Sequence, residues 1–306
     1  MRDKLLITGA SGFLGRRVVA VALERGYDVV GLTRSSHPDM GIDEIVADLT
    51  SARFRADQIF SGEARIAALI HLAWIATPPL FWTSPENRIW RKNSFRLLSE
   101  FIKCVPTGRL VAIGSSAEYG EHVNAAKEDE MCCPHTEYGI AKLQLLEDVA
   151  RYAKQQRFTN WIWLRLFQLY GIGEPPTKLI SSLIGGFLTG SPIRIENPNW
   201  MYDYVNVEDA AAAIVESVES KSTGVFNLAS GAPYAVSAVE SLVRECLEEA
   251  GIHIQKADQP MGYARSTVGG ITADVTKMRG GFKRLPRMSL KERVAEMIRA
   301  KLDDNA

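Results

Sequence analysis

The chain has 306 residues, 46% of them apolar and 24% charged, which is ordinary for a folded globular protein. Lysine plus arginine and aspartate plus glutamate both total 36, so the formal net charge is zero. This balance does not favour a nucleic acid or an anionic membrane as partner. The apolar stretch Leu5–Ile7 is too short for a signal peptide or a membrane span. This length favours one large α/β domain carrying a smaller lobe.

The four cysteines are Cys104, Cys132, Cys133 and Cys246. Adjacent Cys132 and Cys133 do not readily bridge each other, and no metal-ligand spacing is present. The pattern predicts reduced thiols in a cytoplasmic protein and no metal site.

Short apolar runs alternate with amphipathic stretches over the first 160 residues or so. Apolar runs of this kind are typical of parallel strands buried on both faces. The predicted strands are Leu5–Thr8, Asp28–Leu32, Ile45–Ala47, Ala68–His71, Leu110–Gly114 and Trp161–Leu166, and the predicted helices between them are Phe13–Arg25, Glu86–Cys104 and Tyr138–Gln155. This alternation predicts a Rossmann-type, doubly wound parallel sheet.

The regular alternation of strands and helices ends at the turn-rich segment Gly171–Pro176. The later pattern predicts helices near Leu179–Leu188, from Glu208, at Val236–Ala250 and at Leu290–Leu302, with short strands at Ile193–Ile195, Tyr204–Asn206 and Val225–Leu228. We therefore expect a dinucleotide-binding domain over residues 1–170. Residues 171–306 are expected to form mainly a smaller substrate-binding lobe, interleaved with the last strands of the sheet.

A glycine-rich turn, Thr8–Gly15, joins the first strand to the first helix. Glycine permits a tight turn and lets backbone N–H groups approach a pyrophosphate at a helix N-terminus. A plain turn is the alternative, but the position at a strand–helix junction favours a dinucleotide. The residues expected to contact it here are Gly9, Ser11, Gly12, Phe13 and Leu14.

The second strand ends at Thr33 and Arg34, where an NAD enzyme usually has an acid that binds the ribose 2′-hydroxyl. A guanidinium and a hydroxyl suit a 2′-phosphate instead. The sequence therefore favours NADP(H) over NAD(H), the alternative being that Arg34 is a solvated loop residue.

Two further strand ends are expected to border the cofactor. Asp48 and Leu49 follow the third strand, where the carboxylate either meets the adenine amino group or caps the next helix. Leu72, Ala73 and Trp74 follow the fourth strand, at the sheet edge where ligands bind in such folds. We assign no catalytic role to the neighbouring His71.

Tyr138 and Lys142 lie four residues apart on one face of a predicted helix. A tyrosine pKa is normally about 10, and a nearby cation is expected to lower it. A phenol tuned in this way can donate a proton to a carbonyl oxygen as hydride arrives at the carbon. Ser115 and Ser116 end the fifth strand, and one of the two hydroxyls is expected to stabilise the developing oxyanion.

Taken together, these motifs resemble the extended short-chain dehydrogenases, the NAD-dependent epimerase/dehydratase family. The resemblance covers nearly the whole chain. Besides Asn93, it rests on TGASGFLG (Thr8–Gly15), HLAW (His71–Trp74), GSSAEYG (Gly114–Gly120), YGIAK (Tyr138–Lys142), RLFQLYGIGEP (Arg165–Pro175) and DYVNVEDAAAAI (Asp203–Ile214).

The resemblance implies a catalytic set of Ser115, Tyr138 and Lys142, with Ser116 as the alternative hydroxyl and Lys142 also binding the nicotinamide ribose. It places Phe167 and Gln168 beside the nicotinamide and the substrate, and Ser116 near the substrate. Nucleotide-sugar 4-ketoreductases are the branch most similar in motif. They usually have an arginine that clamps the nucleotide diphosphate where this chain has Tyr202, and Arg265 is a candidate for a second such arginine.

Three functions follow from this pattern. The preferred one is NADPH-dependent reduction of a ketone on a small sugar-like substrate, most similar to a nucleoside-diphosphate 4-keto-6-deoxyhexose. A nucleotide-sugar epimerase with tightly bound NAD is the first alternative, and a catalytically silent NADP-sensing regulator is the second. The resemblance also implies a homodimer built from the Glu86–Cys104 and Tyr138–Gln155 helices.

Overall fold

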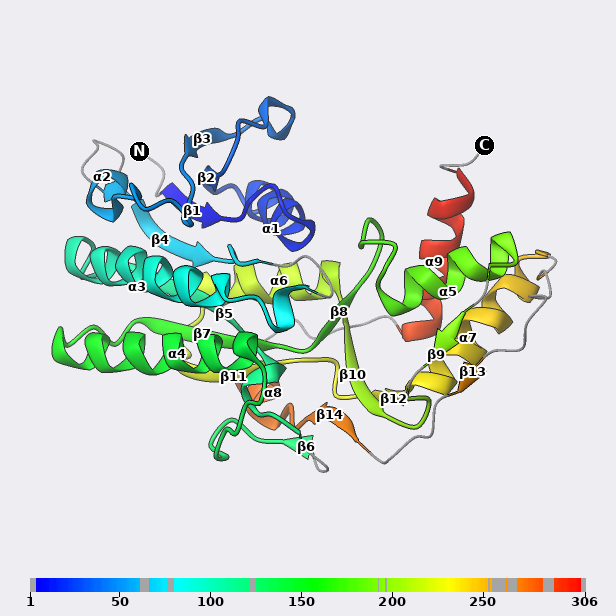
Figure 1. Cartoon of the computed structure of the whole chain (residues 1–306). Coiled ribbons are helices and arrows are strands. Elements are labelled where there is room, and N and C mark those ends of the chain that lie inside the picture. Colours follow the sequence, from blue (N-terminus) through cyan, green and yellow to red (C-terminus); the bar gives the residue numbers. More distant parts are fainter. Residues whose placement is uncertain are drawn as a thin grey trace.

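The computed structural model describes residues 4–60, 66–75, 80–121, 125–191, 193–195, 197–252, 254, 262–263, 269–282 and 289–303. Figure 1 shows two parts, a seven-stranded sheet covered by helices and a smaller lobe that ends in the C-terminal helix. No helix in these described ranges is long and apolar enough to cross a membrane.

The large sheet is parallel throughout, in the order β11-β7-β5-β4-β1-β2-β3. Its strands are β1 (Lys4–Thr8), β2 (Asp28–Thr33), β3 (Asp43–Val46), β4 (Ile66–His71), β5 (Arg109–Ser115), β7 (Trp161–Leu166) and β11 (Gly224–Leu228). The chain runs outward from β1 to β3 and then returns to the other side of β1 at β4. Ligands of open α/β sheets bind where the strand order reverses, at the carboxyl ends of the strands.

Helices cover both faces of this sheet (Figure 1). On one face α1 (Phe13–Glu24) packs beside α6 (Val207–Glu219); on the other α3 (Glu86–Cys104) packs beside α4 (Glu137–Gln155), with the short α2 (Ala56–Phe60) against α3. Within β1, Leu5 and Ile7 join one apolar core and Leu6 joins the other. Such alternation buries a parallel strand on both sides, so the predicted Rossmann-type fold is confirmed.

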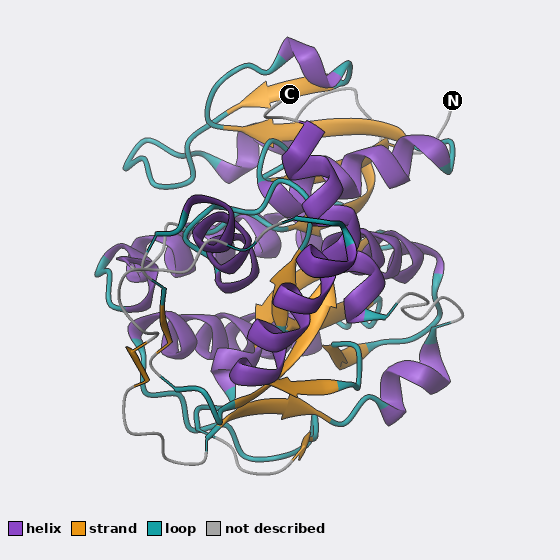
Figure 2. Cartoon of the chain, turned by 90° about the vertical axis from the view of Figure 1, so that its right-hand side faces the viewer, coloured by secondary structure: helices purple, strands orange, loops and turns teal. Residues whose placement is uncertain are grey.

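The second lobe has its own apolar core under α5 (Leu179–Thr189), α7 (Val236–Glu249) and α9 (Leu290–Asp303). Viewed from the side of this lobe, its helices lie in front of the large sheet (Figure 2). A second group of strands connects the two parts in the order β12-β10-β14-β6, with β8 paired to β10. These strands are β6 (Ala125–Ala126), β8 (Gln168–Tyr170), β10 (Met201–Asn206), β12 (Pro233–Ala235) and β14 (Gly270–Ala273).

Several elements differ from the sequence-based prediction. The strands β6, β8, β12 and β14 and the helices α2 and α8 (Thr276–Gly281) were not predicted, and neither was the pairing of β13 (Gly262–Tyr263) with β9 (Arg194–Ile195). Most of these strands have two or three residues, which is too few to show a period of two; β14, with four, is at the lower limit. Residues 171–306 were expected to interleave with the last strands of the sheet, and they contribute α6 and β11 to the first domain.

Candidate active site

The glycine turn lies at the carboxyl end of β1 and leads directly into α1. Gly9 has φ +70°, and a Cβ there would lie 3.0 Å from backbone atoms of Ala73. A Cβ on Gly15 would overlap the carbonyl oxygen of Gly9. These glycines therefore let the first turn of α1 pack directly on the loops after β1 and β4. The free N–H groups of that turn form a cradle suited to a pyrophosphate, so the residues present fit a dinucleotide.

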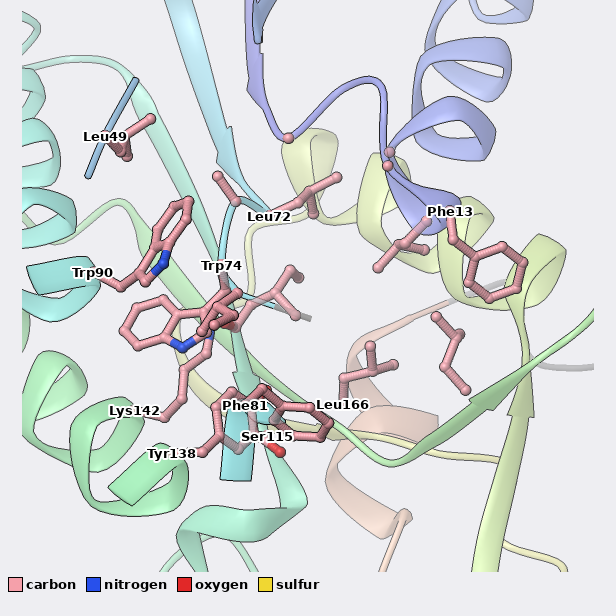
Figure 3. Close-up of a pocket in the computed structure, with 18 of the residues that line it drawn as sticks. Phe13, Leu49, Leu72, Trp74, Phe81, Trp90, Ser115, Tyr138, Lys142 and Leu166 are labelled. Carbon is pink, nitrogen blue, oxygen red and sulfur yellow. The ribbon is translucent and has the colours of Figure 1, made fainter. Parts of the chain in front are cut away.

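A cavity of about 610 Å³ opens beside this turn. Its volume falls within the range of about 300–1,000 Å³ typical of small-molecule sites. Most of the residues selected from the sequence line it: Gly9, Ser11, Gly12, Phe13, Leu14, Thr33, Arg34, Leu49, Leu72, Ala73, Trp74, Ser115, Ser116, Tyr138, Lys142, Phe167 and Gln168. Figure 3 shows Tyr138, Lys142 and Ser115 grouped at one end of it and Phe13 at the other.

Tyr138 and Lys142 lie in the first two turns of α4. The hydroxyl of Thr136 caps this helix by accepting from the N–H of Gly139, at 3.0 Å. A Cβ on Gly139 would overlap the carbonyl oxygen of Ala117, so only glycine lets α4 approach the turn after β5 this closely. Lys142 is 2% exposed, and its ammonium donates to the carbonyl oxygen of Ile113 at 2.8 Å. The helix thus holds both side chains against the end of β5.

Burial controls the protonation of this pair. Desolvation raises the pKa of Tyr138 to about 12, and hydrogen bonding to Ser115 only partly opposes it. Desolvation lowers the pKa of Lys142 to about 7, partly opposed by the charge of Glu118. The expectation that Lys142 lowers the pKa of Tyr138 is therefore wrong for this structure. The lysine itself loses much of its charge near neutrality, and burial outweighs any attraction for a phenolate.

This shift makes the stability of the protein depend on pH. An unfolded lysine has a pKa of about 10.4, so between that value and about 7 the unfolded chain binds a proton that the folded chain lacks. We expect the free energy of unfolding to rise with pH over that interval, by at most about 1.4 kcal/mol per pH unit from this group. Lys142→Met should remove that part of the slope. Urea titrations of both proteins from neutral pH to pH about 9.5 test this, and parallel curves would contradict it.

Ser115 ends β5 and begins a 3-10 turn, Ser116–Glu118. Its hydroxyl accepts from the N–H of Ala117 at 3.1 Å, which leaves the hydroxyl proton free to be donated. Ser115 also forms the hydrogen bond that acts on the pKa of Tyr138. Both Ser115 and Ser116 border the cavity, and the contact with Tyr138 supports Ser115 as the hydroxyl that acts with it.

A buried charge pair lies directly behind this turn. The Glu118 carboxylate is 0% exposed, and it accepts from the N–H of Ser115 at 2.8 Å and from the Arg165 guanidinium at 2.8 Å. The indole N–H of Trp163 donates to the same carboxylate at 3.0 Å. Glu118 is not one of the residues predicted from the sequence to act in catalysis. The structure places it next to the candidate catalytic residues, where it fixes the backbone that carries Ser115.

An aromatic wall, defined here as Trp74, Phe81 and Trp82, surrounds the ring of Tyr138. The ring centroids lie 6.4, 5.0 and 5.7 Å from that of Tyr138, all in edge-to-face geometry. Figure 3 shows Trp74 and Phe81 beside Tyr138 and Lys142. The ammonium of Lys142 lies 4.1 Å from the centre of the Trp74 ring. These rings contribute to the burial that shifts both pKa values.

Asn87, at the start of α3, holds the wall in place. Its side chain accepts from the Trp74 indole N–H at 2.8 Å and donates to the carbonyl oxygen of Phe81 at 2.7 Å. Sequence reasoning selected Trp74 but missed Phe81 and Trp82. The sequence feature that could have revealed them is the pair of adjacent aromatic residues shortly before α3. This pair follows β4, the strand that ends at the cavity.

At the opposite end, Thr33 and Arg34 border the cavity at the end of β2. An acid that the sequence did not reveal lies beside them. Glu44 of β3 accepts from the hydroxyls of Thr33 and Ser36, at 3.3 and 2.9 Å, and from the N–H of His37 at 2.8 Å. Nine residues of loop and turn separate Thr33 from the start of β3, so neither spacing nor pattern indicated this contact.

Asp48 is not among the residues that border the cavity. Its carboxylate accepts from the N–H and the hydroxyl of Thr50, at 2.8 and 2.7 Å. This is a local turn at Asp48–Ser51, and the next helix, α2, begins only at Ala56, so Asp48 does not cap it. A contact with adenine stays a prediction. His71 is buried between the hydroxyls of Thr8 and Ser94, each 2.9 Å away, and desolvation lowers its pKa to about 3. A neutral, fully bonded histidine fits a packing role.

The expected substrate end is bordered by Phe167, Gln168 and Lys178. The ammonium of Lys178 donates to the carbonyl oxygen of Leu169 at 2.5 Å, and burial lowers its pKa. Tyr202 does not border the cavity; its ring packs against Trp200 and Tyr204, with centroids 6.3 Å apart in both cases. Arg265 lies outside the described residues.

Similarity to known proteins agrees with this geometry. The model of the NAD dependent epimerase/dehydratase family matches residues 5–229. The chain belongs to this family. The resemblance to extended short-chain dehydrogenases that the motifs indicated is thereby confirmed.

Two curated relatives act on the same kind of sugar by name. The chain is 27% identical to dTDP-6-deoxy-L-talose 4-dehydrogenase (NAD(+)) of Aggregatibacter actinomycetemcomitans, over 79% of this chain and 90% of the relative. It is 26% identical to dTDP-6-deoxy-L-talose 4-dehydrogenase (NAD(P)(+)) of Kitasatospora kifunensis, over 96% and 94%. Among solved structures, MoeE5 in complex with UDP-glucose and NAD superposes with a TM-score of 0.84 at 27% identity, covering 99% of this chain and 100% of that one.

Proposed function

We propose that this member of the epimerase/dehydratase family is an NADP(H)-preferring 4-ketoreductase, which interconverts a ketone and an alcohol on a nucleoside-diphosphate 6-deoxyhexose. The observation that carries the proposal is the grouping of Ser115, Tyr138 and Lys142 in the same cavity as the glycine turn. The names of the two dehydrogenase relatives support the substrate class. Arg34 at the edge of the cavity supports NADP(H).

The nicotinamide supplies or accepts the hydride when the dinucleotide is bound. Tyr138 is placed to donate its phenolic proton to the carbonyl oxygen during reduction, which turns the ketone into an alcohol. A phenol that holds its proton at neutral pH is already in the form needed for this step. Ser115 is placed to donate a hydrogen bond to the same oxygen as negative charge develops on it. Lys142 is placed to bind the nicotinamide ribose.

The direct test follows nicotinamide absorbance with purified protein. NADPH or NADH is supplied with a dTDP- or UDP-linked 4-keto-6-deoxyhexose, and the reverse reaction uses the corresponding 6-deoxyhexose with NADP⁺ or NAD⁺. We expect turnover with the nucleotide-linked sugar and much less with the free sugar. Absence of turnover in both directions, with the cofactor bound, would refute the proposal.

A 4-epimerase is the second candidate, favoured by the likeness to UDP-glucose 4-epimerase of Corynebacterium glutamicum, 27% identical over 79% of this chain and 80% of that enzyme. An epimerase oxidises and reduces the same carbon and therefore consumes no external cofactor. Stoichiometric NAD in the purified protein, together with conversion of UDP-glucose into UDP-galactose, would favour the epimerase over the ketoreductase.

The homodimer through α3 and α4 and the cytoplasmic location stay predictions. Sedimentation analysis tests the homodimer.

Lys178 is expected to bind the diphosphate of the substrate, because the position expected to carry the clamping arginine holds Tyr202, which packs away from the cavity. Lys178→Ala should raise KM for the nucleotide sugar about tenfold, with a smaller effect on kcat, since a lost charged contact costs about 1.5–3 kcal/mol. Lys277→Ala is the matched control: this lysine also donates to a strand carbonyl, that of Val225, but does not border the cavity. Equal KM values for both variants would exclude the role.

A further inference from the structure

The cavity end at Thr33 and Arg34 combines a cation with an acid. In the proposed dinucleotide site this end, at the carboxyl end of β2, receives the adenosine ribose. Arg34 is exposed, and no hydrogen bond or ion pair of its side chain is present within the described part of the chain. Glu44 pairs with Gly31 in the register between β3 and β2, two residues before Thr33. Its carboxylate therefore lies beside the residues that would surround the 2′-position.

The hydroxyl protons near this position are already used. Thr33 and Ser36 each donate to Glu44, at 3.3 and 2.9 Å. A hydroxyl has one proton but can still accept hydrogen bonds through its oxygen. It can therefore accept from a ribose 2′-hydroxyl, which is a donor, but it cannot donate to a 2′-phosphate, whose ionised oxygens only accept. The hydroxyls that the sequence suggested for phosphate binding are better suited to NAD(H).

The charge of Glu44 also favours NAD(H) over NADP(H). The N–H of His37 donates to both carboxylate oxygens, at 3.0 and 2.8 Å. These bonds, with those from Ser36 and Thr33, lower the pKa of Glu44. The carboxylate is therefore ionised at neutral pH and repels a phosphate placed on the neighbouring ribose. Arg34 is left as the group that attracts it.

We propose that Glu44 is a specificity-determining residue that limits the preference for a 2′-phosphate, so that the protein accepts NAD(H) alongside NADP(H). This inference rests on the proposed dinucleotide function. Arg34 attracts the 2′-phosphate, while Glu44 repels it and occupies the hydroxyls of Thr33 and Ser36. Removing Glu44 should therefore shift cofactor preference toward NADP(H), and removing Arg34 should shift it toward NAD(H).

The test measures binding rather than turnover. Calorimetry gives Kd values for NADP⁺, NAD⁺, adenosine 2′,5′-bisphosphate and 5′-AMP with the wild type, Glu44→Gln and Arg34→Ala. Glutamine keeps the length of the side chain and a carbonyl oxygen that can accept from the N–H of His37. Asp43→Asn is the matched control, because it removes the same charge from the adjacent, exposed position, which pairs with Lys4 at 3.0 Å. Thermal denaturation confirms that each variant is folded.

Glu44→Gln should tighten the two 2′-phosphorylated ligands by roughly three- to tenfold relative to NAD⁺ and 5′-AMP, as expected for removing one like charge near the surface. Arg34→Ala should weaken the same two ligands selectively, and Asp43→Asn should change neither ratio. Equal weakening of all four ligands by Glu44→Gln would mean that Glu44 only holds the loop, and would overturn the inference while leaving the dinucleotide site intact. If no nucleotide binds to the wild type, the proposed function fails with it.

Discussion

Tyr138→Phe should lower kcat by about 10²- to 10⁴-fold, the usual contribution of a positioned acid or base. The substitution removes one oxygen atom and keeps the ring, so the edge-to-face contacts with Trp74, Phe81 and Trp82 remain. Because the phenol acts on the reacting oxygen, Kd for the dinucleotide should change little. Steady-state kinetics gives kcat, and calorimetry gives Kd.

Tyr152→Phe provides the matched control for this loss. Tyr152 is on the same helix, α4, and its ring packs against Phe95 at 6.0 Å, but it does not border the cavity. The control should retain nearly full activity. A Tyr138→Phe enzyme with near-wild-type kcat would remove the phenol from the chemical step.

The parts of the site that are local in the sequence were predictable from it. The glycine turn depends on a strand, a helix and three glycines within eight residues, and the Tyr138–Lys142 pair depends only on helical spacing. The helix that was predicted at Glu86–Cys104 has those bounds in the structure, because Pro85 precedes its first residue and Pro106 follows shortly after its last.

Contacts between distant segments were not predictable in this way. Glu44 meets Thr33 because a loop of nine residues folds back on β2, and no single-sequence pattern encodes that path. Glu118 and Arg165 are 47 positions apart and meet only because β5 and β7 are neighbours in the sheet. The pKa of Tyr138 was misjudged for a similar reason. Spacing shows which charges are near each other, but the cost of desolvation depends on the surrounding aromatic rings.

Glu118→Ala should be the most destabilising single change at the site. It removes the acceptor for Ser115, Trp163 and Arg165. Arg165 is only 3% exposed, so its guanidinium would stay buried without a carboxylate partner. Breaking a buried ion pair by removing one partner costs about 3–5 kcal/mol. Urea denaturation gives the free energy of unfolding. Glu245→Ala, which breaks the exposed contact with Lys291, should cost less than about 1 kcal/mol.

The double variant Glu118→Leu/Arg165→Met separates the two roles of Glu118. Replacing both charges with apolar side chains removes the uncompensated guanidinium, so part of the lost stability should return, although the buried N–H groups of Ser115 and Trp163 still lack an acceptor. The hydrogen bond to the N–H of Ser115 does not return, and the turn that presents the serine hydroxyl to Tyr138 loses its anchor. We therefore expect kcat to stay low in a protein that is more stable than Glu118→Ala. Recovery of kcat together with stability in the double variant would show that Glu118 serves only to neutralise Arg165. For the single variant Glu118→Ala, a decrease of less than about 1 kcal/mol in the free energy of unfolding would show that the ion pair is exposed to water.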